Sequence, residues 1–128
     1  MLKSAAILFG VVFLAVGVLG FVPGVTSNQM LLGIFHVNAA HNAVHLLSGA
    51  IALWTGLTSA AHARVYFRVF GVVYALVAVL GFYAGDGMLL GLISNNAPDT
   101  WLHVAIAVVA LALGFAVKDD SPGAKAAA

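Results

Sequence analysis

The stretch FGVVFLAVGVLGFVPG, residues 9–24, returns in modified form as FGVVYALVAVLGFYAG at residues 70–85, with more than half of the positions identical. Both copies are apolar and uncharged, and both end in glycine. An apolar run of about 20 residues crosses the hydrocarbon core of a bilayer as a helix. Recurrence of such a run indicates an internal repeat. The sequence therefore predicts a helical membrane protein built from two related units.

The composition agrees with a membrane environment. Hydrophobic residues make up 63% of the 128 residues and charged residues 7%, and the mean hydropathy is +1.11. Ordinary soluble domains carry about 25% charged residues. The chain has no cysteine, which excludes disulfides and thiolate metal sites, and its net charge of +1 excludes a nucleic-acid partner. We expect one transmembrane domain over 1–128, in the plasma membrane, with the lipid bilayer as its partner.

Four apolar segments predict membrane-spanning helices, at 5–21, 40–57, 65–83 and 101–117. The connections 22–39 and 84–100 contain no Lys or Arg. All basic residues lie outside those two connections: Lys3, Arg64, Arg68, Lys118 and Lys125. Because basic residues favour the cytoplasmic side, both termini are predicted to be cytoplasmic.

The repeat continues beyond the first pair of spans. MLLGIFHVNAAHNAVH at 30–45 aligns with MLLGLISNNAPDTWLH at 88–103. We therefore expect an all-α four-helix bundle of two tandem helical hairpins, 3–57 and 64–117, related by a pseudo-twofold axis along the membrane normal, followed by a disordered tail at 118–128. The MLLG segments are too short to cross a bilayer, and we interpret them as interfacial or re-entrant lids.

Polar residues recur at the same spacing in the two units. Asn38, His41 and His45 form N-x-x-H-x-x-x-H, which aligns with N-x-x-D-x-x-x-H at residues 96–103. Positions i, i+3 and i+7 share one face of a helix. Polar side chains within membrane helices face the bundle interior, since exposure to lipid is costly. The two stripes are therefore expected to face each other.

One hypothesis for the stripes is a metal site. Three imidazoles and one carboxylate would form its ligands: His41, His45, Asp99 and His103. This donor set suits zinc, copper or iron. Four further polar residues would orient the ligands: Asn38, Asn42, Asn96 and Ser48.

A structural hypothesis explains the same residues without a ligand. Asn38 and Asn96 stand where helices begin, and asparagine is a favoured N-cap. Asp99 near a helix N-terminus is favoured by the helix dipole. His45 and His103 would form interhelical hydrogen bonds. The protein would then be an accessory subunit of a membrane complex, or a homo-oligomer.

Two further hypotheses use the same histidines. His45 and His103 would be the axial ligands of a haem, although the flanking Gly and Ala residues imply helices too close together for a porphyrin. Alternatively, His and Asp residues would form a proton relay, although Tyr74 is the only sign of a polar path in the cytoplasmic half.

The segments GFVPG at 20–24 and LLGIFHVNAAHNAVHLLSG at 31–49, with the later N-x-x-D-x-x-x-H, resemble a family of small bacterial four-helix membrane proteins. That family is a domain of unknown function with the motif N-x-x-H-N-x-V-H-L, and the resemblance covers 20–114. It implies a bacterial plasma-membrane location and the four-span fold, but no activity. Thr100 stands where the family pattern has Asn. With no nucleophile-elbow or phosphate-loop pattern, we expect no catalytic residues and no enzyme.

Overall fold

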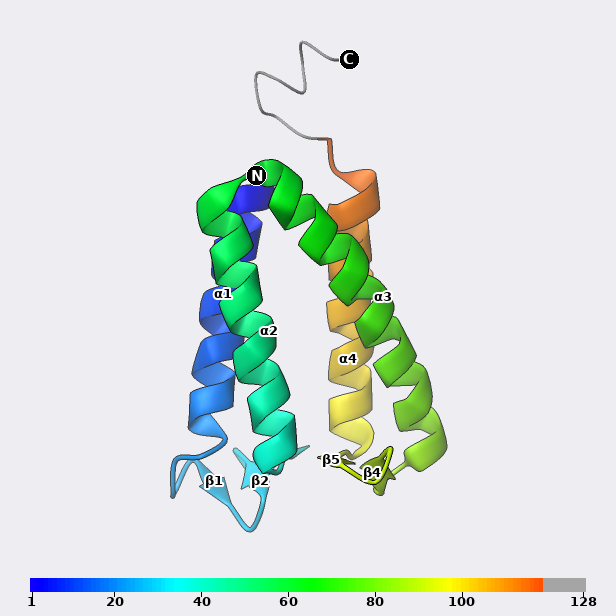
Figure 1. Ribbon diagram of the computed structural model, residues 1–128. Helices are drawn as coiled ribbons and strands as arrows, with labels where there is room; N and C mark the ends of the chain where they lie inside the picture. The colour runs from blue at the N-terminus through cyan, green and yellow to red at the C-terminus, as the bar shows by residue number, and fades with distance from the viewer. Residues whose placement is uncertain (119–128) are drawn as a thin grey trace.

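The computed structural model describes residues 1–118, and long helices dominate that part of the chain (Figure 1). The helices are α1 (Leu2–Leu19), α2 (Ala39–Thr58), α3 (Ala60–Ala84) and α4 (Ala97–Leu111), which continues as the π-helical η1 (Ala112–Ala116). The strands are β1 (Thr26–Ser27), β2 (Met30–Leu31), β3 (Phe35–His36), β4 (Met88–Leu89) and β5 (Ile93–Ser94). Except for Lys118, the tail predicted at 118–128 lies outside the described residues.

The four helices form two antiparallel pairs, α1 with α2 and α3 with α4 (Figure 1). The strands gather at one end of the molecule, which we call the strand end. The start of α1, the α2–α3 connection and η1 lie at the other end, the turn end. Ser59 separates α2 from α3, and its hydroxyl accepts the backbone N–H of His62 at 3.0 Å to cap α3.

Glycines allow the paired helices to approach closely. A Cβ on Gly10 of α1 would lie 2.8 Å from the carbonyl oxygen of Gly49 on α2. In turn, a Cβ on Gly49 would lie 2.9 Å from the carbonyl oxygen of Gly10. On the second pair, a Cβ on Gly71 would lie 3.0 Å from the backbone nitrogen of Leu111. Small residues give membrane helices this close contact, in which dispersion attraction replaces the hydrophobic effect.

Aromatic side chains pack the two pairs together toward the turn end. Phe67 is completely buried, and its ring meets that of Phe9 edge-on with centroids 5.4 Å apart. Tyr66 stacks on Phe70 at 4.4 Å and contacts Phe9 at 6.1 Å. Such aromatic pairs contribute about 0.5–1.5 kcal/mol each beyond the area they bury. The apolar core therefore joins the two pairs at this end.

The two MLLG segments form short antiparallel β-hairpins, which the sequence analysis did not predict within the mostly helical fold. In β2–β3, Met30 pairs with His36, and in β4–β5, Met88 pairs with Ser94. The residues that follow β2 and β4, a leucine and then a glycine, all have φ between 53° and 70°. Positive φ at two successive positions is the geometry of a tight hairpin turn. The segments therefore turn back as strands.

Three helical segments are long and apolar enough to cross a membrane: Leu2–Leu19, Ala60–Ala84 and Ala97–Ala116. They overlap the predicted spans 5–21, 65–83 and 101–117. The remaining predicted span, 40–57, coincides with α2, which is a helix of 20 residues with a more polar sequence. All four helices carry exposed apolar side chains, for example Leu8, Leu47, Leu76 and Val108. An apolar surface on every helix is typical of a protein surrounded by lipid.

Candidate metal centre

Asn38 and Asn96 both cap their helices and connect the two helix pairs. Each Oδ1 accepts the backbone N–H three residues later, at 2.9 and 3.0 Å respectively. The Nδ2 of Asn38 donates to the carbonyl of Leu92, and the Nδ2 of Asn96 donates to that of Ile34, both at 2.9 Å. Each asparagine therefore holds the hairpin of the opposite half. These bonds agree with the N-cap role that the structural hypothesis assigned.

His41 and Asp99 occupy aligned positions in the two halves, and each bonds to the β-hairpin of the other half. The residues that they contact, Ser94 and His36, also align with each other. The Oδ2 of Asp99 accepts the backbone N–H of His36 at 3.1 Å and that of Asn96 at 3.0 Å. The Nδ1 of His41 lies 2.9 Å from the carbonyl oxygen of Ser94. Since a carbonyl only accepts, Nδ1 carries the proton, and the Nε2 of a neutral His41 has a free lone pair.

The three predicted histidine ligands come together between α2 and α4. One ligand nitrogen from each of His41, His45 and His103 lies within 4.8 Å of the other two. All three side chains are buried, with at most 4% of their surface exposed. Asp99 is not in this group; its Oδ2 accepts the backbone N–H groups of His36 and Asn96. The structure thus brings together three of the four predicted ligands.

Two of the histidines have a buried ring nitrogen without a partner. Among the described residues, the Nδ1 atoms of His45 and His103 are the only buried side-chain nitrogen or oxygen atoms that make no hydrogen bond. An unsatisfied buried polar atom costs about 1–3 kcal/mol. The interhelical hydrogen bonds that the structural hypothesis assigned to these histidines are therefore not formed at Nδ1. Both atoms remain able to bind a ligand.

The group fits a metal ion after a small adjustment. Two nitrogens bound to a tetrahedral zinc ion at about 2.0–2.1 Å are about 3.3 Å apart. Nitrogens within 4.8 Å would therefore have to approach by up to about 1.5 Å, through rotation of the imidazole rings. The hydrogen bond of His41 to Ser94 already fixes one ring. Three neutral imidazoles suit zinc, copper and iron.

The same geometry argues against a haem held by His45 and His103. Their ring centroids are 6.4 Å apart, a separation that suits two axial imidazoles of one iron, so the obstacle is not this distance but a third ring. The ring of His41 lies 4.8 Å from that of His45 and 5.7 Å from that of His103. It therefore occupies space beside both would-be axial ligands, and a porphyrin has no room there.

Two tyrosines extend the polar cluster toward the turn end. The hydroxyl of Tyr74 donates to the Oγ of Ser48 at 3.0 Å, and that of Tyr66 donates to the carbonyl of Ser48 at 3.2 Å. Ser48 was predicted to orient the ligands, but its hydroxyl bonds to Tyr74. Tyr66 was not predicted as part of the cluster, although its spacing of eight residues from Tyr74 places both on one face of α3.

Asn42 and Thr100, which also align, pack against glycines of the neighbouring helix. A Cβ on Gly20 would collide with the side-chain amide of Asn42, and a Cβ on Gly81 would collide with the Oγ1 of Thr100. Thr100 accepts from the Nδ2 of Asn95 at 3.0 Å. Asn42, predicted to orient the ligands, lies instead against α1. Thr100 thus stands where the first half has the side-chain amide of Asn42, and its hydroxyl makes a hydrogen bond to Asn95.

The comparison with known proteins bears on the family alone. No curated protein and no solved structure matches the chain. A family model described as a domain of unknown function, DUF4383, matches residues 3–116. That match confirms the resemblance to an uncharacterised family and extends over nearly all of the described residues. The chain belongs to the DUF4383 family.

Proposed function

We propose that this protein binds one transition metal ion, zinc, copper or iron, through His41, His45 and His103 within a four-span bundle of the bacterial plasma membrane. The observation that carries the proposal is the pair of unpartnered Nδ1 atoms on His45 and His103. A metal ion bound to these nitrogens and to the Nε2 of His41 would satisfy both orphan atoms at once. The proposal assigns metal binding and no catalytic step.

The charge of the site limits how a metal would be held. The group contains three histidines and no carboxylate, since Asp99 is bonded to the backbone. Neutral imidazole is the form that binds metal, so the protein ligands contribute no negative charge. An uncompensated divalent charge is costly in a low-dielectric interior. The site therefore favours either monovalent copper or a divalent ion that carries an additional anionic ligand.

Metal analysis tests this proposal directly. Protein purified in detergent, without chelator or metal-affinity resin, is expected to contain about one metal ion per chain by elemental mass spectrometry. The variant His45→Ala/His103→Ala is expected to lose that metal while retaining its helical circular dichroism. His62→Ala removes an exposed histidine of the turn end and is the matched control. If the wild-type protein contained no metal even after incubation with each of zinc, copper and iron, the proposal would be refuted and the histidines would have only a packing role.

The proposed topology places the strand end outside the cell and both termini in the cytoplasm. Lys3, Arg64, Arg68 and Lys118 lie toward the turn end, and basic residues favour the cytoplasmic side. Because α2 lies along α1, it crosses the bilayer with α1. The paired asparagine caps and the equal hairpin registers support an origin of the two halves by duplication.

Single-cysteine labelling tests the topology, because the natural chain has no cysteine. Ser27 is exposed at the strand end and Ala61 at the turn end. A membrane-impermeant maleimide is expected to label Ser27→Cys in intact cells, and to label Ala61→Cys only after the membrane is permeabilised. The opposite pattern would reverse the orientation, and labelling of both in intact cells would refute the proposed crossing.

A further inference from the structure

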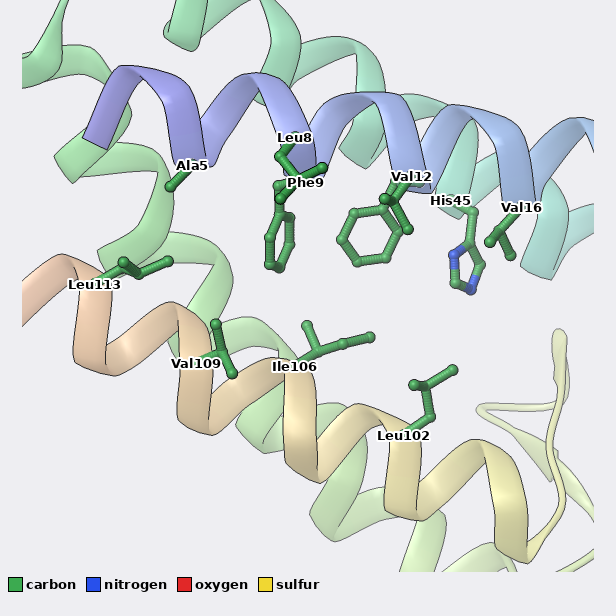
Figure 2. A pocket seen from close by; sticks show the side chains of 11 residues that line it. Ala5, Leu8, Phe9, Val12, Val16, His45, Leu102, Ile106, Val109 and Leu113 are labelled. Carbon is green, nitrogen blue, oxygen red and sulfur yellow. The ribbon is translucent and has the colours of Figure 1, made fainter. Parts of the chain in front are cut away.

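A long apolar groove opens between α1 and α4, and we call it the α1–α4 groove. Its volume is about 340 Å³, within the range of about 300–1,000 Å³ that ligand pockets occupy. Figure 2 shows its two walls facing each other. The walls include Leu8, Val12 and Val16 on α1, and Leu102, Ile106 and Val109 on α4. Every residue that lines the groove is apolar except His45.

The groove is elongated and reaches the surface that faces lipid. Its residues on α1 run from Ala5 to Val16, a distance of about 16 Å along a helix axis. Leu8 and Val109, on opposite walls, are 66% and 50% exposed. These exposed walls belong to helices that are apolar enough to cross a membrane. A hydrocarbon chain can therefore enter sideways from the bilayer without passing through water.

The polar end of the groove is part of the metal centre. His45 lines the groove, and Figure 2 shows its ring directed into the space between α1 and α4. The side chain is 4% exposed, and its Nδ1 has no hydrogen-bond partner. A molecule with its chain in the groove would thus place its head against the histidine cluster.

The charge of the centre selects the head group. A divalent ion held by three neutral imidazoles needs an anionic ligand, and the described protein supplies none within the cluster. His45 also lies seven residues after the N-cap Asn38, about 10 Å along α2. Both a phosphate and a carboxylate supply negative charge, but the carboxylate is the smaller group and suits a centre whose three histidine side chains are at most 4% exposed.

We propose that the α1–α4 groove binds one long-chain carboxylic acid, with its hydrocarbon chain between the two helices and its carboxylate coordinated to the metal beside His45. This inference rests on the proposed function, because the metal supplies the charge that holds the head group. Because the chain enters from hydrocarbon and not from water, its contacts with α1 and α4 contribute dispersion attraction, and the carboxylate–metal bond supplies the specificity. The metal centre then takes its ligand from the membrane.

Binding of tritiated palmitate to detergent-purified, metal-loaded protein tests the inference. Saturable binding of about one palmitate per chain is expected. Hexadecanol, which has the same chain length but no charge, is expected to compete at least about tenfold less well, a difference of about 1.4 kcal/mol. Removal of the metal is expected to weaken palmitate binding by a similar factor. Equal binding to metal-free and metal-loaded protein would overturn the proposed coordination.

A variant that fills the groove separates the two proposals. Ile106→Trp places a large ring between α1 and α4, and it is expected to abolish palmitate binding while the metal content stays at the wild-type value. Val108→Trp, on the exposed face of the same helix, is the matched control, and this variant is expected to bind both palmitate and the metal ion. A wild type that holds metal but no palmitate overturns this inference alone. A wild type that holds no metal overturns the proposed function and, with it, this inference.

Discussion

Replacing Asp99 by alanine is expected to destabilise the protein by about 2–6 kcal/mol, because it leaves two partly buried backbone N–H groups without an acceptor, at about 1–3 kcal/mol each. The side chain is 2% exposed, and its Oδ2 accepts the N–H groups of both His36 and Asn96. His36 belongs to the hairpin of the first half, so the substitution also releases a bond between the two helix pairs. The measurement is thermal unfolding in detergent, followed by circular dichroism.

The variant Asp99→Asn distinguishes this structural role from the ligand role that the sequence suggested. Asparagine keeps one carbonyl oxygen that can accept both N–H groups, but it loses the charge that strengthens them. We therefore expect about half of the destabilisation and an unchanged metal content. If Asp99→Asn were as stable as wild type but lost its metal, the aspartate would be a ligand and the contacts described here would not be its main role.

Gly10→Val is expected to cost about 3 kcal/mol or more, at or above the upper end for overpacked sites. A Cβ at this position would lie 2.7 Å from the backbone nitrogen of Leu53 and 2.8 Å from the carbonyl oxygen of Gly49. Both are backbone atoms of α2, so no side-chain rotation relieves the overlap. The two helices must move apart, and α2 would carry His41 and His45 with it.

Ala15→Val is the matched control for Gly10→Val, because it adds a β-branched side chain at an exposed position of the same helix. A change of less than about 0.5 kcal/mol is expected there, as for most surface substitutions. Unfolding midpoints in detergent compare the two variants. A Gly10→Val protein with wild-type stability would show that α1 and α2 are not in backbone contact.

The helices could be predicted from the sequence because long apolar runs have few alternatives in a membrane. The approach of the two polar stripes could also be predicted, since the repeat placed His45 and His103 at equivalent positions. The role of Asp99 was ambiguous, because a carboxylate three residues after an N-cap is suited both to a capping box and to a ligand set. In the structure its Oδ2 accepts the backbone N–H groups of His36 and Asn96, which favours the capping role.

Two other features could not be predicted from local sequence. MLLG is a short apolar segment without the alternation that marks strands, and only its glycine hints at a turn. The hairpins form because positive φ at Leu32 and Leu90 reverses the chain. The α1–α4 groove depends on the spacing between two helix pairs, which no periodicity within a helix encodes. Its position beside His45 is therefore information that only the three-dimensional arrangement supplies.

The two hydrogen bonds that Asn38 and Asn96 donate to each other's half of the protein bear on its ancestry. Asn38 donates to the hairpin turn of the second half and Asn96 to that of the first, so the two bonds are reciprocal. A self-complementary surface of this kind is how twofold homodimers associate. Under the proposed duplication, an ancestral gene for one helical hairpin would already have encoded both sides of this contact. Fusion would then have allowed the positions of His41 and Asp99 to diverge, one toward a hydrogen-bond donor and the other toward an acceptor.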